Sequence, residues 1–348
     1  MNYWYATLEE AKKTALLWNG DPQTVEHLEN FSAAVFKFST FSGETGILRF
    51  IDTSQRTYEQ ILGEIDFLEF IKSEDQFLNI GNANSTFKNK NVFGHKSNNK
   101  SSAENLIAYY PIATKDGTLA LKFQGVNGPM TCSVFKYIEG IELREGSPYL
   151  TDELYLKWGR NLAAIHQASR NYQPKNIRRW QWDEEHLIKN ALTLIPSEDT
   201  KSRDQFLEIM RRCQALEKND SNFGMIHADH APQNFIFNPV TDEITAIDFG
   251  NCCYHWYLAD LAISLSVNRR KENKEKIKSL ILSGYCETES LPGNYEELLD
   301  LFIKLRVLYV YLDRLFRFGP IPTADERKLL LTLKERVHSN EGWEIISQ

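Results

Sequence analysis

The chain has 348 residues, of which 42% are hydrophobic and 25% are charged, and its formal net charge at pH 7 is −7. These values are typical of a soluble globular protein that is long enough for one large domain or two smaller ones. The negative charge argues against nucleic acid or an anionic membrane surface as a partner, and it is compatible with a cationic ligand.

The cysteines and the start of the chain indicate a cytoplasmic protein. There are five cysteines, an odd number, and no two of them have the C-x-x-C spacing of a zinc or redox site. The opening "MNYWYATLEEAKKTALLWNG" carries Glu9 and Glu10 and has no apolar stretch behind a basic region, so it differs from a signal peptide. No apolar run approaches the ~20 residues that cross a bilayer. We therefore expect a reducing cytoplasm and no membrane partner.

Strands and one helix are predicted for the first part of the chain. Residues 33–40 ("AAVFKFST") and 45–52 ("TGILRFID") are rich in β-branched and aromatic side chains, and the Ser-Gly-Glu between them suits a hairpin turn. Residues 57–73 then place apolar side chains at helical spacing, with Glu64 on the other side of the helix.

A surface insertion and three further strands complete the N-terminal part. Residues 81–105 are rich in Asn, Ser and Lys, which predicts a surface insertion with a flexible tip. Residues 105–123 resemble two strands around an Asp-Gly turn, and residues 130–140 are one more strand that ends at a glycine. We place a strand-rich lobe over residues 1–137.

Helical patterns dominate residues 138–348. A helix that follows Thr151 has an apolar stripe, and this threonine suits the N-cap position. Helices are expected at residues 151–170, 183–194 and 202–218 and, with few interruptions, from residue 258 to the end. The expected fold is α+β and bilobal, with a small antiparallel sheet and one helix in the first lobe and mostly helices in the second. Ligand sites favour such a junction between lobes.

Residues 225–250 ("MIHADHAPQNFIFNPVTDEITAIDFG") place three oxygen-bearing side chains around a pair of strands. Asp229 and Asn234 precede the strand "FIF", and Asp248 follows the strand "ITAI". Antiparallel pairing brings the entry of the first strand and the exit of the second to one edge, so the two carboxylates and the amide oxygen should converge. Such oxygens suit Mg²⁺ bound together with substrate phosphates. Phosphoryl transfer also needs a carboxylate that orients the attacking hydroxyl.

The stretch "HADHAPQN…IDFG" resembles the catalytic and metal-binding loops of the aminoglycoside phosphotransferase and choline kinase family, the small-molecule relatives of protein kinases. The resemblance implies a protein-kinase-like fold in which Asp229 is the catalytic base and Asn234 and Asp248 are magnesium ligands. Asp260 in "WYLADLAISL" would take a structural acid position. The family loop usually reads H-G-D-L-H-P-x-N, whereas this chain has Ala231 at the fifth position and a histidine just before it.

Upstream segments resemble the nucleotide-binding elements of the same family in the same order. "LENFSAAVFKF" resembles the hairpin over the nucleotide, which implies that Asn30, Phe31 and Ser32 lie over the phosphates of ATP. "GILRF" resembles the strand that carries a phosphate-binding basic residue, here Arg49 in place of lysine. Glu64 on the next helix would form a fixed, bidentate pair with this arginine. No G-x-G-x-x-G sequence precedes the first strand pair.

"SVFKYIEG" resembles the hinge between the lobes of the same family. The hinge would comprise Lys136, Tyr137 and Ile138, with backbone groups of the first and last bonding the adenine. The helical tail "FIKLRVLYVYLDRLFRF" is more similar to the homoserine-kinase-like and stress-response-kinase-like branches of the family.

Simpler interpretations of the polar residues stay open. Arg49 and Glu64 would form a surface ion pair of little energetic value if both were exposed. His227 and His230 resemble part of a phosphohydrolase metal cluster, but no further histidines lie at suitable spacing. We expect His227 to pack under the loop and to bond backbone near Asp248, and we expect His230 to be exposed.

The acceptor site is less defined by the sequence. Two tryptophans and three acids after the first long helix would line a pocket for a cationic or polar acceptor, or else form a solvated helix start. They are Trp180, Trp182, Asp183, Glu184 and Glu185. The aromatic helix at residues 296–318 is expected to serve the core or an interface. Cys252 and Cys253 are interpreted as packing residues.

The expected reaction is transfer of the γ-phosphate of Mg-ATP to a hydroxyl of a small molecule, such as an aminoglycoside, an amino alcohol or a homoserine-like compound. Two alternatives remain at this point. One is a protein Ser/Thr kinase of the stress-response type. The other is a nucleotide-binding pseudokinase with a regulatory role, which the altered loop and the missing glycines favour.

Overall fold

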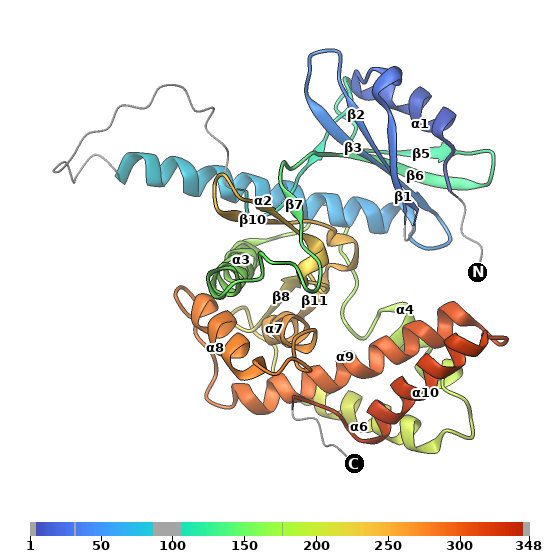
Figure 1. Cartoon of the computed structure of the whole chain (residues 1–348), viewed down its shortest axis with the longest axis vertical. Helices are drawn as coiled ribbons and strands as arrows, with labels where there is room; N and C mark the ends of the chain where they lie inside the picture. Colours follow the sequence, from blue (N-terminus) through green and yellow to red (C-terminus); the bar gives the residue numbers. More distant parts are fainter. Residues whose placement is uncertain (1–4, 31–32, 86–105, 176, 344–348) are drawn as a thin grey trace.

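The computed structural model describes residues 5–30, 33–85, 106–175 and 177–343, without the side chains of residue 30 and of residues 75–85. Figure 1 shows a sheet lobe with α1 beside it, a larger and mostly helical lobe below, and α2 between the two. The helices are α1 (Leu8–Ala15), α2 (Tyr58–Ser85), α3 (Asp152–Asn171), α4 (His186–Lys189), α5 (Ala191–Leu194), α6 (Thr200–Gln214), α7 (Tyr257–Ser266), α8 (Lys274–Tyr285), α9 (Tyr295–Phe318) and α10 (Ala324–His338). The strands are β1 (Glu26–Asn30), β2 (Ala34–Ser39), β3 (Thr45–Asp52), β4 (Pro111–Ile112), β5 (Ala120–Gln124), β6 (Pro129–Lys136), β7 (Ile141–Glu142), β8 (Phe223–Ile226), β9 (Phe235–Asn238), β10 (Glu243–Ala246) and β11 (Cys253–Trp256).

In the part of the chain that the structure describes, the N-terminal sheet has six antiparallel strands in the order β1-β2-β3-β6-β4, and β5 also pairs with β6. The sequence predicts β4 and β5 as two strands around a turn, and they do lie on either side of one. They do not pair with each other. Instead both add to β6, β4 near Phe135 and β5 near Cys132, because β6 is long enough to pair with two short strands end to end.

Alternation along the strands gives the sheet one face toward α1 and one toward the cleft. Phe36 and Phe38 of β2 are almost fully buried in a cluster with α1, whereas Val35 and Lys37, which alternate with them, line the cleft. Successive strand residues point to opposite faces, so the same alternation in β3 turns Arg49 toward the cleft.

Helix α2 packs its predicted apolar stripe between the lobes. Ile61, Ile65 and Leu68 are buried in the larger hydrophobic cluster, which also contains residues of the helical lobe. The helix continues to Ser85, so the prediction that an insertion starts at residue 81 is wrong by five residues. The remaining part of that predicted insertion, residues 86–105, lies outside the described residues.

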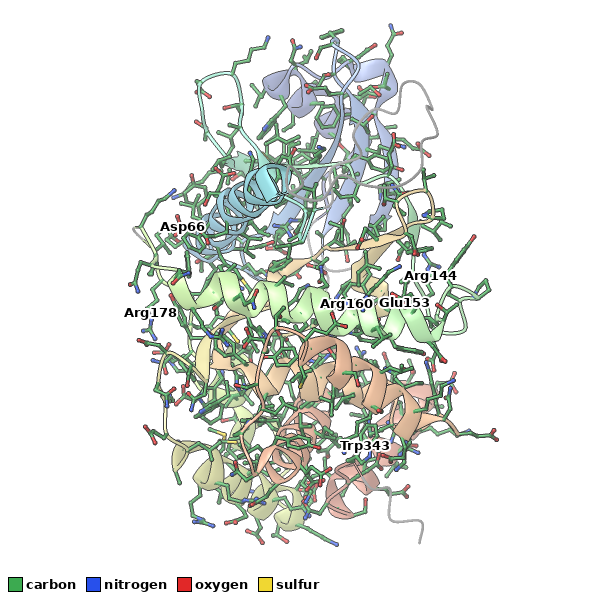
Figure 2. The ribbon with its side chains drawn as sticks, turned by 90° about the vertical axis from the view of Figure 1, so that its left-hand side faces the viewer. Asp66, Arg144, Glu153, Arg160, Arg178 and Trp343 are labelled. Carbon is green, nitrogen blue, oxygen red and sulfur yellow. The ribbon has the colours of Figure 1, made fainter. Side chains whose placement is uncertain are left out.

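Helices α3 and α8 cross with their backbones in close contact. A Cβ atom at Gly159 would lie 2.0 Å from the carbonyl oxygen of Ile281, and one at Gly284 would lie 2.0 Å from that of Leu156. Both positions therefore need glycine. Figure 2 shows α3 crossing the middle of the molecule, with Glu153 and Arg160 on its outer side. Thr151 accepts a hydrogen bond from the Leu154 N–H, as expected of the predicted N-cap.

Several C-terminal elements differ in detail from the sequence prediction. The helix predicted at residues 183–194 is two short helices, α4 and α5, that meet at Asn190. Gly319 ends α9 with a positive φ of 64°, as the Gly-Pro signal predicts. None of the described helices is long and apolar enough to cross a membrane.

Candidate active site

The hairpin of β9 and β10 brings the three predicted oxygen-bearing residues to one end. Phe235 pairs with Ala246, and the Ile247 N–H donates to the carbonyl of Asn234 at 2.9 Å. Asn234 just before β9 and Asp248 just after β10 therefore lie side by side. The amide nitrogen of Asn234 also donates to the backbone carbonyl of Asp229 at 2.8 Å and to its carboxylate at 3.2 Å.

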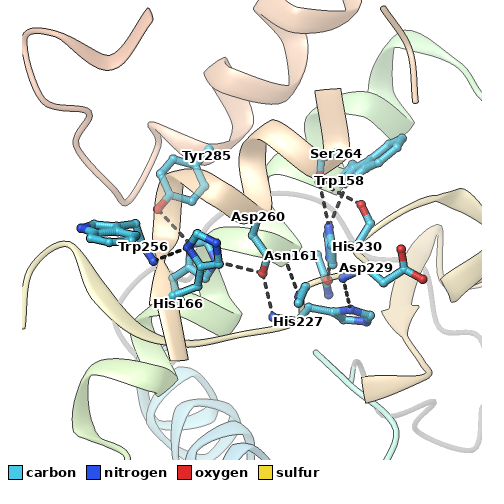
Figure 3. Close-up of polar contacts among 12 residues, drawn as sticks. Trp158, Asn161, His166, His227, Asp229, His230, Trp256, Asp260, Ser264 and Tyr285 are labelled. Carbon is cyan, nitrogen blue, oxygen red and sulfur yellow. Dashed lines mark hydrogen bonds and ion pairs between the residues drawn. The ribbon is translucent and has the colours of Figure 1, made fainter. Parts of the chain in front are cut away.

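The loop that carries Asp229 is held from below by a buried carboxylate. Asp260 near the start of α7 accepts the backbone N–H groups of His227 at 2.7 Å and Ala228 at 2.8 Å, and it also contacts the His166 ring at 3.3 Å (Figure 3). Burial opposes ionisation of Asp260, but the His166 hydrogen bond holds its pKa below the ordinary value. The structural acid position inferred from the resemblance matches these contacts.

His227 lies as predicted, beneath the loop. Its ring is buried, and Nε2 lies 3.0 Å from the carbonyl oxygen of Ile247, the residue before Asp248. Because a carbonyl only accepts, Nε2 carries the proton and Nδ1 accepts from the Asp229 N–H at 3.3 Å. Both ring nitrogens are thus used in positioning the loop.

The prediction that His230 is exposed is wrong, because this ring is fully buried behind the loop. Trp158 Nε1–H donates to its Nδ1 at 2.9 Å, and its Nε2 lies 3.0 Å from the side-chain oxygen of Asn161 (Figure 3). Burial, reinforced by the nearby His227, holds the pKa of His230 well below 6.5, so the ring is neutral. A neutral ring with both nitrogens engaged holds the loop against α3.

The predicted pair of Arg49 and Glu64 is buried and bidentate. The two guanidinium nitrogens donate to the two carboxylate oxygens at 2.9 Å and 3.0 Å, and Tyr109 Oη donates to the same carboxylate at 3.3 Å. Burial would lower the pKa of Arg49, but Glu64 raises it above its ordinary value. The interpretation as a surface ion pair is therefore wrong. Removing one partner of such a pair typically costs about 3–5 kcal/mol.

A cleft of about 960 Å³ between the lobes collects most of the predicted site residues. From the sheet lobe and the hinge it is lined by Arg49, Lys136, Tyr137 and Ile138, and from the helical lobe by Asp229, Asn234 and Asp248. Glu64 lies behind Arg49 and is fully buried.

The hairpin at residues 30–32 and the hinge are the two remaining parts of the predicted nucleotide site. Asn30 ends β1 and pairs with Ala34, but Phe31 and Ser32 lie outside the described residues. At the hinge, the Lys136 N–H already donates to the carbonyl of Tyr110 at 2.9 Å. This N–H is part of the sheet and is not a donor for adenine, and the contact of adenine with other backbone groups of Lys136 and Ile138 stays a prediction.

One face of α9 contributes residues that the sequence prediction missed. Arg306 donates to the Asp229 carboxylate at 2.6 Å, and Tyr309, Asp313 and Arg317 also line the cleft. The sequence interpretation assigned this helix to the core or an interface, and its other face is indeed buried. The missed signal was a polar stripe at spacings of three and four residues, which marks one helix face.

A second, smaller cavity of about 80 Å³ lies next to the catalytic loop. Of the residues predicted for an acceptor pocket, Trp180, Trp182 and Glu185 line it. Asp183 is not among its lining residues, and neither is Glu184, whose carboxylate instead caps the turn by accepting the Gln181 N–H at 2.8 Å. Cys252 and Cys253 are buried, as expected of packing residues, and the second of them borders this cavity.

This fold and these loops define a class of protein. The model of the phosphotransferase enzyme family matches residues 111–298, and the chain belongs to that family. It is 25% identical over 220 residues to the amicoumacin kinase of Bacillus subtilis (strain 168). That alignment covers 60% of this chain and 63% of the relative, which is less than two thirds of the relative's length.

Solved structures share the fold at low sequence identity. The amicoumacin kinase hAmiN in complex with AMP-PNP, Ca²⁺ and Ami is similar with a TM-score of 0.80 at 22% identity, over 99% of this chain and 96% of that one. A microcompartment-associated aminopropanol kinase is similar with a TM-score of 0.71 at 18% identity, over 97% and 99% of the two chains. The predicted protein-kinase-like bilobal fold is confirmed.

Proposed function

We propose that this protein transfers the γ-phosphate of Mg-ATP to a hydroxyl group of a small molecule. The observation that carries the proposal is the meeting of Asp229, Asn234 and Asp248 at one end of a hairpin, across the cleft from the buried Arg49. Family membership and the relative that is named a kinase support it. Nucleotide would lie between the lobes, with its adenine against Ile138 and its phosphates near Arg49.

The proposed metal site fits the oxygens that are present. The amide nitrogen of Asn234 is used by Asp229, which orients the side-chain oxygen of Asn234 away from it, and Asp248 adds a carboxylate. Two protein oxygens are the number that Mg²⁺ commonly uses when nucleotide phosphates and water complete its coordination. When bound, the metal would neutralise the charge that develops on the transferred phosphoryl group.

In the proposed reaction, the acceptor hydroxyl donates a hydrogen bond to the Asp229 carboxylate. Its oxygen forms the new bond to the γ-phosphorus, the bond from phosphorus to the ADP oxygen breaks, and the hydroxyl proton passes to Asp229. Asn234 keeps this carboxylate oriented through its amide N–H. Arg49, fixed by Glu64, would hold the phosphates that remain on ADP.

The chemical class of the phosphate acceptor follows less directly from the residues of the cleft. We propose a small molecule with a hydroxyl group, and the amino alcohols, one of the acceptor types expected from the sequence, are the first to test. Protein phosphorylation has no specific contact in the cleft that favours it.

The replacement Asp229→Asn tests the mechanism. We expect it to lower ATP-dependent phosphorylation of an amino alcohol panel roughly 100- to 10,000-fold, the usual contribution of a general base, while Mg·ATP binding stays. Turnover is measured as ADP release together with a phosphorylated product, and nucleotide binding by calorimetry.

Asp204→Asn is the matched control, because Asp204 is exposed on α6 and does not line the cleft, so its replacement should change neither quantity. Full activity of Asp229→Asn would contradict the mechanism. Nucleotide binding without turnover on any hydroxyl acceptor, in the unmodified protein, would instead identify a nucleotide-binding module.

A further inference from the structure

The small cavity beside the catalytic loop is mostly apolar. Trp180, Trp182, Ile263, Phe302 and Leu305 form much of its wall. Its histidine, His255, is buried and accepts the Trp256 N–H through Nδ1 at 2.8 Å. Burial lowers the pKa of His255 to about 3, so this ring contributes no charge at neutral pH.

This cavity adjoins the proposed reaction centre. Arg306, Tyr309 and Asn251 line both the cavity and the interlobe cleft, and Ala228, the residue before Asp229, lines the cavity. Arg306 also donates to the Asp229 carboxylate at 2.6 Å. A molecule whose hydroxyl reaches Asp229 can therefore extend past Arg306 into the cavity.

Two residues that line the cavity each have a buried polar atom without a partner among the described residues. The indole nitrogens of Trp180 and Trp182 are buried, and no described residue accepts a hydrogen bond from either. Trp182 as a whole is only 3% exposed. A buried N–H donor without an acceptor is costly, so such a group commonly marks a place where a ligand oxygen binds.

We propose that this cavity binds the non-reacting part of the acceptor, and that this part is an apolar ring with an ether or carbonyl oxygen directed at the tryptophan N–H groups. The inference rests on the proposed function, since it concerns the molecule whose hydroxyl meets Asp229. Aromatic walls and two N–H donors suit a flat apolar group with one acceptor atom. Glu185 and Arg306 are the acidic and basic side chains in this lining, and the rest of the wall is mostly apolar.

A matched set of three amino alcohols tests this assignment. The probes are isopropanolamine, its phenoxy derivative, and the derivative in which a methylene replaces the ether oxygen. Each is titrated by calorimetry into the full chain saturated with Mg·AMP-PNP. We expect the phenoxy compound to bind roughly tenfold or more tightly than isopropanolamine, as burial of a ring predicts. We expect it to bind about two- to tenfold more tightly than the methylene compound, as one hydrogen bond predicts.

Two kinds of variant separate the ring from its oxygen. Ala259 lines the cavity, so the added side chain in Ala259→Leu should fill it and abolish the preference for the ring, while AMP-PNP binding shows that the protein is folded. Trp180→Phe and Trp182→Phe keep an aromatic wall and remove one N–H each, so at least one of them should abolish the preference for the ether oxygen. Ala324→Leu, at an exposed position of α10, is the matched control and should change neither the preference for the ring nor the preference for the ether oxygen.

Equal affinities for isopropanolamine and its phenoxy derivative would overturn the assignment. So would a ring preference that survives in folded Ala259→Leu. Phosphorylation is followed in the same samples with Mg·ATP, so that failure of the proposed function is seen separately. Tight binding of the phenoxy compound without any product would refute the transfer reaction and leave the assignment of the cavity in place.

Discussion

His230 shows how one buried ring fixes the catalytic loop. Trp158 on α3 donates to its Nδ1, and Ser264 on α7 donates to its backbone carbonyl at 2.9 Å. Asp260 and the rings of His227 and His166 surround it. The usual family loop has leucine at this position, which would fill space without bonding α3. Here His230 links the loop to two helices, to α3 through its ring and to α7 through its backbone carbonyl.

The neutral state of this ring makes stability depend on pH. The unfolded chain protonates His230 below 6.5, whereas the folded ring stays neutral, so stability is fully present above 6.5 and falls as the pH falls. Urea unfolding at about pH 7.5 and about pH 5.5 should therefore differ by about 1.4 kcal/mol from this residue alone. His230→Leu should remove that part of the difference.

An unchanged pH dependence in folded His230→Leu would show that the ring is protonated in the native state. The replacement itself leaves Trp158 with a partner, because its indole N–H also reaches Ser264 Oγ at 3.1 Å. At neutral pH, His230→Leu should therefore lower the free energy of unfolding only through the lost hydrogen bond to the side-chain oxygen of Asn161 and through changed packing. The expected decrease is on the order of 1–3 kcal/mol.

Ala228, in the same loop, has an unusual backbone conformation. Its φ is 63°, in the left-handed region where a Cβ costs roughly 1–2 kcal/mol. The usual family loop has glycine here. The hydrogen bond from the Ala228 N–H to Asp260 stabilises this strained backbone conformation. Comparison with the family loop at its second position, where glycine is usual, would have predicted this backbone conformation.

At the scale of elements, the segment between α3 and α4 connects the two lobes through Arg179. Its guanidinium group donates to three backbone carbonyls: Cys252 at 2.7 Å, Gly250 at 2.6 Å and Gln60 at 2.7 Å. The first two lie just after Asp248, and the third lies in α2. Burial lowers the pKa of Arg179, and carbonyl oxygens alone are its partners in these bonds. One side chain therefore sets the distance from the proposed metal loop to α2.

Arg179→Lys is expected to loosen this connection, because a single ammonium group cannot reach three carbonyls in a fixed fan. We expect a loss of about 3 kcal/mol in the free energy of unfolding, since hydrogen bonds from charged donors contribute about 1.5–3 kcal/mol each. The KM for Mg·ATP should rise as Asp248 becomes less well held. Arg178→Lys, at the exposed neighbouring arginine, is the control. A stable variant with unchanged KM would mean that the loop is positioned by other contacts.

At the scale of the whole molecule, the cleft is built from both lobes. Strands β2 and β3 supply one wall, and the hairpin of β9 and β10 together with α9 supplies the other. Neither lobe alone has both the buried arginine and the carboxylates. A nucleotide in this cleft should therefore couple the stability of the two lobes.

Binding of Mg·AMP-PNP at about 100 times its Kd should stabilise the protein by about 2.7 kcal/mol. Hydrogen exchange should slow in β3 and in α9 together, because each contributes to the cleft. Asp248→Asn should lose the part of the stabilisation that depends on Mg²⁺, while Asp204→Asn should keep it. Protection confined to β3 would indicate that the nucleotide contacts the sheet lobe alone.

The sequence by itself determined the features that depend on local order along the chain. The alternation in β2 and β3, the stripe of α2 and the meeting of Asn234 and Asp248 at one end of a hairpin follow from periodicity and short-range pairing. The bidentate partner of Arg49 could also be named, because strand and helix are consecutive. These features account for the α+β class with two lobes, whereas the resemblance to the family supplied the protein-kinase-like fold and the roles of the residues in the cleft.

Only the tertiary structure decided what distant segments do to one another. Arg306, 77 positions after Asp229, meets its carboxylate only because α9 packs beside the catalytic loop. The burial of His230 depends on α3 and α7, and the apolar cavity depends on tryptophans from one segment facing α7 and α9. Such contacts depend on how helices pack, and the spacing of residues within a single segment does not predict that packing.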